Sequence, residues 1–186
     1  MKISNYYLLA LLLFTSWVQG QRMYPNQKGI ELQIGSTATN PINNNYYAQL
    51  ALIINKSRGS YQIWALEYTH QSQVYNRQKI PLQTYITEGG YGFILWSNSK
   101  KSILLNTAIT ALIGYEQINR GVHILADGAQ IINQDRFIYG MGGRIRLETY
   151  LSDRFILLFQ SQIKAIFETD WQHFRPATGL GFRFTL

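Results

Sequence analysis

Polar and apolar residues alternate along most of this chain. The clearest case is residues 136–167, where two alternating segments flank a short polar turn. In the first segment, one face carries Phe137, Tyr139, Met141, Ile145 and Leu147. The opposite face carries glycine and charged residues. A period of two sustained over this length predicts long β-strands with one apolar and one polar side.

The same alternation predicts eight strands in the whole chain. Six of them are expected near residues 28–35, 46–55, 60–70, 81–96, 102–117 and 174–186, and the other two form the hairpin of residues 136–167 with its turn at 151–153. Glycines at 89, 90 and 92 suit the sharp curvature of a small barrel. Apolar residues toward lipid and polar residues toward a packed interior are typical of a small membrane barrel.

The connections between these strands are expected to alternate in length. Long polar loops are predicted at residues 36–45, 71–79, 119–134 and 169–173, and tight turns at 56–59, 97–101 and 151–153. Outer-membrane barrels have an even number of strands, short periplasmic turns and longer outer loops. The pattern therefore predicts an all-β fold, an eight-stranded antiparallel β-barrel in the outer membrane of a Gram-negative bacterium.

The N-terminus has the features of a signal peptide. Lys2 precedes an apolar run that ends near Val18, and Gly20 is small enough to lie before a cleavage site. We expect residues 1–20 to be a cleaved signal peptide and residues 21–186 to be a single transmembrane barrel domain. The chain contains no cysteine, which excludes disulfides, thiol catalysis and cysteine-based metal sites.

The predicted strands direct charged residues into the barrel. An eight-stranded barrel has an interior just wide enough for side chains. Buried charges persist when they are paired and hydrogen-bonded, so we interpret these residues as a structural ion-pair network; a proton or ion path is the alternative. The predicted lumen residues are Glu67, Glu88, Glu116, Glu148, Glu168, Arg144, Arg146, Lys164, Arg175 and Arg183.

The predicted periplasmic turns are basic. They carry Lys56, Arg58, Lys100, Lys101 and Arg154, in a chain with a formal net charge of +7. Such a rim suits docking of an acidic partner, nucleic acid or anionic lipid, and an ordinary solvated rim explains the charges equally well. These turns lack the interleaved aromatic residues that stack on bases, so we expect no direct contact with nucleic acid.

Candidate catalytic residues are few. His70 and Ser72 form an H-x-S pair at the outer end of a strand, an arrangement similar to that of outer-membrane lipid A deacylases. A serine nucleophile needs a base oriented by an acid, and the nearest acid, Glu67, falls on the opposite face. The three histidines lack metal-ligand spacing. We therefore expect no enzyme, catalytic residue, metal, cofactor or small-molecule substrate.

Several segments carry a family likeness. They are YQIWALEYTHQ (61–71), ITEGGYGF (86–93), GYEQINRG (114–121), FIYGMGGRIRLETYLSDRF (137–155) and FRPATGLGFRF (174–184). With them the chain resembles the TraO family, conjugal transfer proteins encoded on conjugative transposons of Bacteroidetes. The resemblance implies a role in the envelope part of a conjugation apparatus, a type IV secretion-like system. It also implies that the partners are outer-membrane lipid and other proteins of the apparatus.

The functional prediction is accordingly a structural or docking barrel of a conjugative DNA-transfer apparatus. An eight-stranded lumen is too narrow to pass DNA. The apolar run of the loop at 119–134 suggests a contact with the recipient surface or with other machinery. The alternatives are a general small barrel for envelope integrity or adhesion and, as a third reading, a lipid A-modifying hydrolase.

Overall fold

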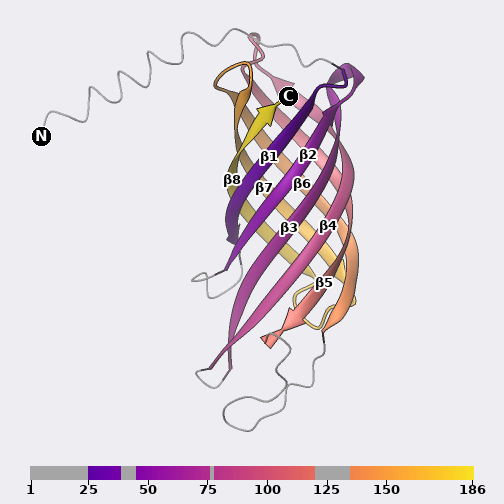
Figure 1. Ribbon diagram of the computed structural model, residues 1–186, viewed down its shortest axis with the longest axis vertical. Helices are drawn as coiled ribbons and strands as arrows, with labels where there is room; N and C mark the ends of the chain where they lie inside the picture. The colour runs from indigo at the N-terminus through magenta and orange to yellow at the C-terminus, as the bar shows by residue number, and fades with distance from the viewer. Residues whose placement is uncertain (1–24, 39–44, 76–77, 120–134) are drawn as a thin grey trace, which may run out of the picture.

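The computed structural model describes residues 25–38, 45–75, 78–119 and 135–186 as a closed antiparallel barrel (Figure 1). Each strand pairs with its neighbours in sequence, and β1 pairs with β8. The strands are β1 Lys28–Thr37, β2 Tyr46–Asn55, β3 Ser60–Tyr75, β4 Gln78–Ser97, β5 Ile103–Ile118, β6 Arg136–Tyr150, β7 Phe155–Phe167 and β8 Phe174–Thr185. The predicted signal peptide, residues 1–20, and residues 120–134 of the predicted outer loop lie outside the described residues.

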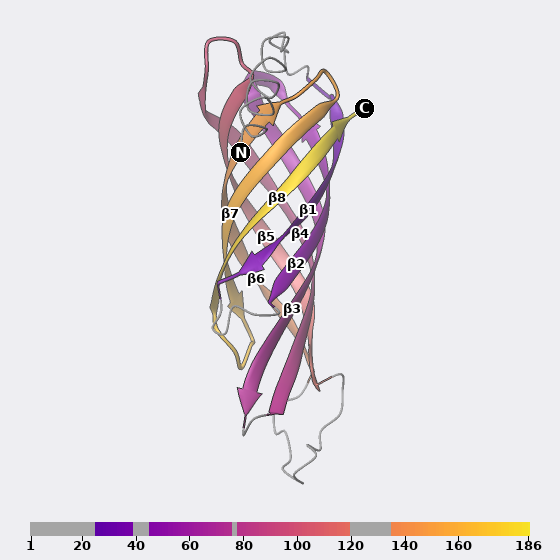
Figure 2. The same cartoon turned by 90° about the vertical axis from the view of Figure 1, so that its left-hand side faces the viewer.

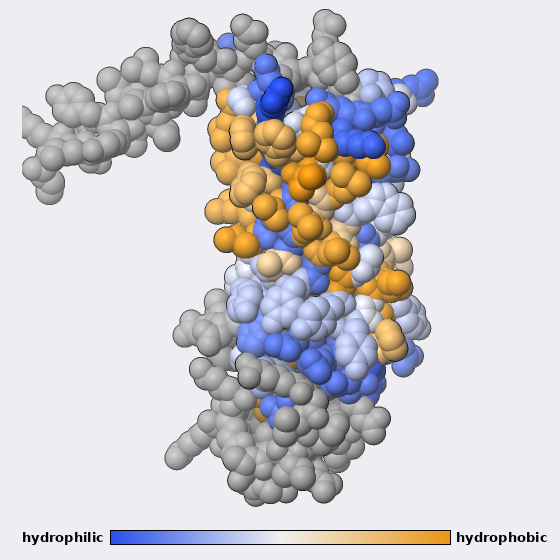
Figure 3. Space-filling model, in the orientation of Figure 1, coloured by the Kyte–Doolittle hydropathy of each residue, from blue (hydrophilic) through white to orange (hydrophobic). Residues whose placement is uncertain are grey.

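Alternation along each strand separates two environments. In β2, Tyr47, Gln49 and Ala51 are buried in the lumen, whereas Leu50 between them is exposed. The outward residues are mostly large and apolar, and Phe137 is 81% exposed. Figure 3 shows them gathered in an apolar band on the viewed face. Apolar side chains that face outward around the whole barrel are the arrangement expected of a protein surrounded by lipid.

The three connections predicted as tight turns, between β2 and β3, β4 and β5, and β6 and β7, all lie at one end of the barrel, together with the C-terminus (Figure 1). The first of them contains η2, the three-residue turn Ser57–Gly59, in which Arg58 and Gly59 adopt positive φ values. The β1–β8 closure continues to this end, where the Leu186 amide donates to the Lys28 carbonyl at 2.9 Å. Among the described residues, no helix is long and apolar enough to cross a membrane.

The connection between β3 and β4 differs from the prediction. Residues 71–79 were expected to form a loop, but the ladder between the two strands continues from Gln71–Leu82 to Tyr75–Gln78. This polar stretch extends as a hairpin because its backbone groups are paired within the ladder, whatever the polarity of its side chains. The two strands therefore project beyond the rest of the barrel (Figure 2), and the expected alternation of long and short loops fails here.

Close packing inside the narrow lumen depends on glycine at specific places. Gly92 of β4 lies under the ring of Tyr61 in β3, and a Cβ at this position would overlap that ring. Tyr61 is thereby buried across the lumen beside the guanidinium of Arg146, which lies 5.9 Å from its ring centroid. The β4–β5 register also shifts between Ile94 and Trp96. Glycine and an irregular register are the devices by which small barrels accommodate curvature.

Candidate functional site

Among the described residues, ten charged side chains are buried in the lumen, and they form three groups along the barrel. The group nearest the short turns consists of Glu31, Glu148, Arg146 and Arg183. Arg183 donates to Glu31 at 2.6 Å and to Glu148, and Arg146 donates to Glu31 at 2.9 Å. Two carboxylates and two guanidiniums give this group no net charge. Neutral, hydrogen-bonded groups are the arrangement in which charges tolerate burial.

The middle group is neutral as well. Arg144 of β6 pairs with Glu88 of β4 at 2.6 Å, and Lys164 of β7 pairs with Glu67 of β3 at 2.6 Å. Lys164 also lies 3.8 Å from Glu88, so the two pairs form one cluster. Gln49 joins them, since its Nε2 donates to Glu67 at 3.0 Å and its Oε1 accepts from Arg144 at 3.4 Å.

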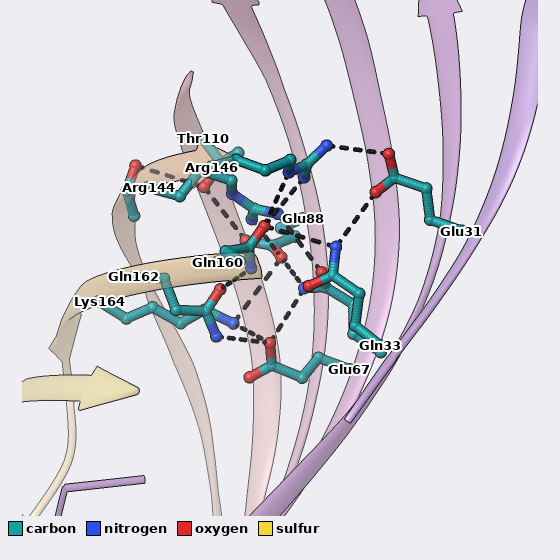
Figure 4. A network of polar contacts seen from close by, with 12 residues as sticks. Glu31, Gln33, Glu67, Glu88, Thr110, Arg144, Arg146, Gln160, Gln162 and Lys164 are labelled. Carbon is teal, nitrogen blue, oxygen red and sulfur yellow. Dashed lines mark hydrogen bonds and ion pairs between the residues drawn. The ribbon is translucent and has the colours of Figure 1, made fainter. Parts of the chain in front are cut away.

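Glutamine side chains connect the first two groups (Figure 4). The Gln160 carbonyl accepts from Arg146 at 2.9 Å, and the Gln160 amide donates to Gln162 at 3.0 Å. Gln162 in turn donates to Glu67 at 3.1 Å. Because an amide both donates and accepts, this chain extends the network along the barrel without adding charge.

The third group lies near the end of the barrel opposite the C-terminus. Arg175 of β8 pairs with Glu116 of β5 at 2.7 Å, and the hydroxyl of Thr169 donates to Glu116 at 2.8 Å. Arg175 also donates to Thr169 at 2.9 Å. A small hollow of about 10 Å³ lies between this group and the middle one, with Thr84 and Lys164 in its lining. This volume is about the smallest that can hold one buried water molecule.

The structure places nine of the ten predicted lumen residues inside the barrel. Glu168 is the exception and was wrongly predicted. It is exposed, because β7 ends at Phe167 and Glu168 adopts a φ of 57°, which breaks the alternation. Glu31, absent from the prediction, is the fifth buried acid. Its position between outward Ile30 and Leu32 was the sequence signal that would have identified it.

The five predicted rim residues lie at the end of the barrel that carries the short turns. Lys56 and Arg58 are in the β2–β3 turn, Lys100 and Lys101 in the β4–β5 turn, and Arg154 in the β6–β7 turn. Apart from Lys56, which is half-buried, these side chains are exposed. Among residues 56–59, 98–102 and 151–154, the one acid is Asp153. We call the five basic residues the basic rim.

The opposite end has a different charge. The charged residues there whose side chains are described are Asp135, Arg136, Glu168 and Asp170, and Arg136 pairs with Asp170. Acids outnumber bases there, and the lumen groups are neutral. The excess positive charge of the described chain is therefore concentrated on the basic rim and neighbouring Lys28.

His70, Ser72 and Glu67 are not arranged as a triad. The ring of His70 stacks on Tyr46 with a centroid distance of 5.4 Å, whereas Glu67 lies in the lumen and pairs with Lys164. Ser72 is buried, and its backbone amide donates to the Asn45 side chain at 2.8 Å. In the described ranges, no group of three His, Cys, Asp or Glu side chains is placed to hold a metal ion.

Comparison with solved structures identifies the barrel type. Neisserial surface protein A is 10% identical, with a TM-score of 0.60, and the match covers 87% of this chain and 97% of that one. Ail of Yersinia pestis, solved with the heparin analogue sucrose octasulfate, is 10% identical, with a TM-score of 0.57 and coverage of 88% and 100%. The N-terminal barrel of Pseudomonas aeruginosa OprF is 13% identical, with a TM-score of 0.50 and coverage of 87% and 98%. At these identities the likeness establishes the fold, that of a small outer-membrane β-barrel.

Sequence comparison identifies the family. A search of curated proteins gave no match. The family model described as "Conjugative transposon protein TraO" matches residues 24–186, which include every described residue of the barrel. The match thus covers the lumen network and the basic rim, and the chain belongs to the TraO family of conjugative transposon proteins.

Proposed function

We propose that this protein is a closed, non-enzymatic barrel in the outer membrane of a Gram-negative cell, where its basic rim docks an acidic protein of the conjugation apparatus. Membership of the TraO family supports the link to conjugation. The outer-membrane barrel fold and the outward apolar band support the location. The docking role is supported by the concentration of positive charge on the basic rim, at one end of the barrel.

The packed lumen argues for an anchor rather than a conduit. Charged, amide and aromatic side chains cross the barrel at successive levels, and Arg146, Tyr47 and Tyr61 are among its most deeply buried residues. An eight-stranded barrel has no room for a nucleic acid strand in addition to its own side chains. A protein of this shape contributes to DNA transfer by holding or positioning other components.

The basic rim suits an acidic protein surface. Its lysines and arginines come from three separate turns, so they form a broad ring instead of a line along a groove. Among these turn residues there is no aromatic side chain to stack on bases. Charge complementarity of this kind raises the association rate and selects the orientation of a partner. With the outer loops facing away from the cell, the rim faces the periplasm, where the apparatus spans the envelope.

The first experiment measures conjugation frequency from donors that lack the protein, with and without the restored copy. A large drop rescued by the wild-type copy supports the proposal, and unchanged transfer removes the conjugation role. The second experiment restores the Lys100→Glu/Lys101→Glu variant and measures transfer together with co-purification of apparatus proteins from cross-linked envelopes.

A matched variant controls for total charge. Lys79→Glu/Arg136→Glu makes the same charge change at the opposite end of the barrel. We expect loss of transfer and of the co-purified partner for the rim variant, and near wild-type values for the control, with equal amounts of both barrels in the outer membrane. Equal behaviour of the two variants would exclude docking through the rim.

A further inference from the structure

An apolar trough crosses the outer surface of the neighbouring strands β8, β1, β2, β3 and β4. It has a volume of about 830 Å³ and includes Leu32, Ile34, Leu50 and Leu66 in its lining. A second hollow of about 710 Å³ shares Ile34, Ala48 and Leu180 with it and is also lined by Tyr46 and Phe159. Ala48 is small and lies between Ile34 and Tyr68 in the strand register, so the surface is depressed there. A shallow apolar depression within the lipid-facing band is suited to an acyl chain.

A polar and aromatic cluster lies at the outer end of this trough. Tyr68 and Tyr85 line the trough itself, and their ring centroids are 5.3 Å apart. Tyr46 lies 6.2 Å from Tyr68 and stacks on His70, and Gln83 donates to the Tyr68 hydroxyl at 3.2 Å. We call these five residues the tyrosine cluster. It is continuous with the trough, and the two together form an amphipathic surface.

The composition of the cluster indicates which headgroup it would accept. None of its members is a lysine, arginine or carboxylate, so it offers no fixed charge to a phosphate. It presents aromatic faces, phenol hydroxyls and the amide of Gln83. Aromatic faces pack against the C–H faces of sugars, while hydroxyl and amide groups bond to sugar hydroxyls. The chemistry favours an uncharged carbohydrate over an anionic headgroup.

We propose that the trough and the tyrosine cluster together bind one glycolipid of the outer leaflet, with an acyl chain along Ala48 and a sugar against Tyr68 and Tyr85. This site rests on the proposed placement in the outer membrane and is independent of the role in conjugation. It lies on the side wall at the outer end, away from the basic rim, so lipid and protein partners do not compete for one surface.

The test uses the protein purified from membranes and native mass spectrometry at equal lipid concentrations. The probes are dioleoyl monogalactosyl diacylglycerol, dioleoyl phosphatidylcholine and dioleoyl phosphatidylglycerol, which share their acyl chains. We expect retention of the galactolipid to exceed that of either phospholipid about tenfold, the effect of one or two net hydrogen bonds. Equal retention of all three, or preference for phosphatidylglycerol, would overturn the proposal.

Two variants and a control locate the site. Ala48→Trp fills the trough and should reduce galactolipid retention to the phospholipid level. Tyr68→Leu keeps the apolar surface and should remove the preference while leaving general lipid binding. Ala111→Trp, an equivalent outward alanine on β5, should behave as wild type. A loss shared by Ala48→Trp and Ala111→Trp, with both variants folded by circular dichroism, would mean that the trough is not the binding site. Because no conjugation partner is present in this assay, its result is separate from that of the transfer experiments.

Discussion

Arg146 of β6 donates to Glu31 of β1 across the lumen, with 2.9 Å between Nη1 and Oε1, although the two residues are 115 positions apart in sequence. Both side chains are fully buried, at 0% exposure. The same carboxylate oxygen accepts from Arg183 of β8 at 2.6 Å. One carboxylate thus connects three strands, including the two that close the barrel.

Replacing Glu31 with glutamine should therefore destabilise the barrel strongly. The substitution retains the size of the side chain but leaves Arg146 and Arg183 with Glu148 as the remaining carboxylate of their group. Breaking a buried ion pair on one side costs about 3–5 kcal/mol. Urea unfolding of the barrel in lipid vesicles measures this loss.

Asp170→Asn is the control for Glu31→Gln. It breaks the Arg136–Asp170 pair, in which each side chain is about one-third exposed (33% and 35%). Surface pairs contribute about 0–1 kcal/mol, so this variant should unfold nearly as the wild type does. Similar small losses for both variants would show that Glu31 is not essential to the network.

The Arg144–Glu88 pair should show strong coupling in a double-mutant cycle. Arg144→Met alone leaves a buried carboxylate with less compensation, and Glu88→Leu alone leaves a buried guanidinium. Each single substitution should lower the free energy of unfolding by about 3–5 kcal/mol, the cost of removing one partner of a buried ion pair. The double variant retains the Lys164–Glu67 pair and leaves the group neutral. Its loss in free energy of unfolding should be clearly smaller than the sum of the two single-variant losses. Additive losses, measured by the same urea titrations, would contradict a paired arrangement.

Glu31 and Glu168 show what the sequence could and could not reveal about the lumen. Alternation between Ile30 and Leu32 was sufficient to direct Glu31 inward. Alternation beyond Phe167 wrongly placed Glu168 inside, because periodicity holds only while the backbone remains extended. The inward position next in the chain is taken by Thr169, from the β7–β8 loop.

The identity of the ion pairs was beyond sequence reasoning for a different reason. The alternation of inward and outward residues assigns Arg146 to the lumen. It does not show which acid pairs with Arg146, because that depends on the stagger between the strands of the closed barrel. The β3–β4 hairpin illustrates the same limit. Gln71 and Gln73 are polar, as in a loop, and only the ladder with β4 shows that this segment is a strand.

The packed lumen predicts that the protein forms no open channel. In planar lipid bilayers the inserted barrel should give no discrete conductance steps, because side chains fill an eight-stranded interior. Protease protection of the membrane-embedded strands confirms insertion in the same preparation. Regular, ion-selective steps from the wild-type protein would contradict a closed lumen and favour an ion path through the charged groups.

An arginine introduced on the outward face should destabilise the barrel in the middle of a strand but not in a turn. Ile109 lies in the middle of β5, faces outward and is 69% exposed. Arginine at the midplane of a barrel costs about 2–4 kcal/mol, so Ile109→Arg should lower the free energy of unfolding from lipid vesicles by that amount. The comparison is Leu151→Arg, in the β6–β7 turn, where the side chain is 59% exposed.

Both leucine and isoleucine at these positions are exposed apolar residues, and a soluble barrel would tolerate arginine equally well at either. In a membrane, the turn residue reaches the aqueous boundary, where arginine costs about 0–1 kcal/mol. A large difference between the variants therefore reports the position of the hydrocarbon core along the barrel. Equal, small effects of Ile109→Arg and Leu151→Arg would mean that the outward apolar band does not face lipid, and the proposed location would fail with it.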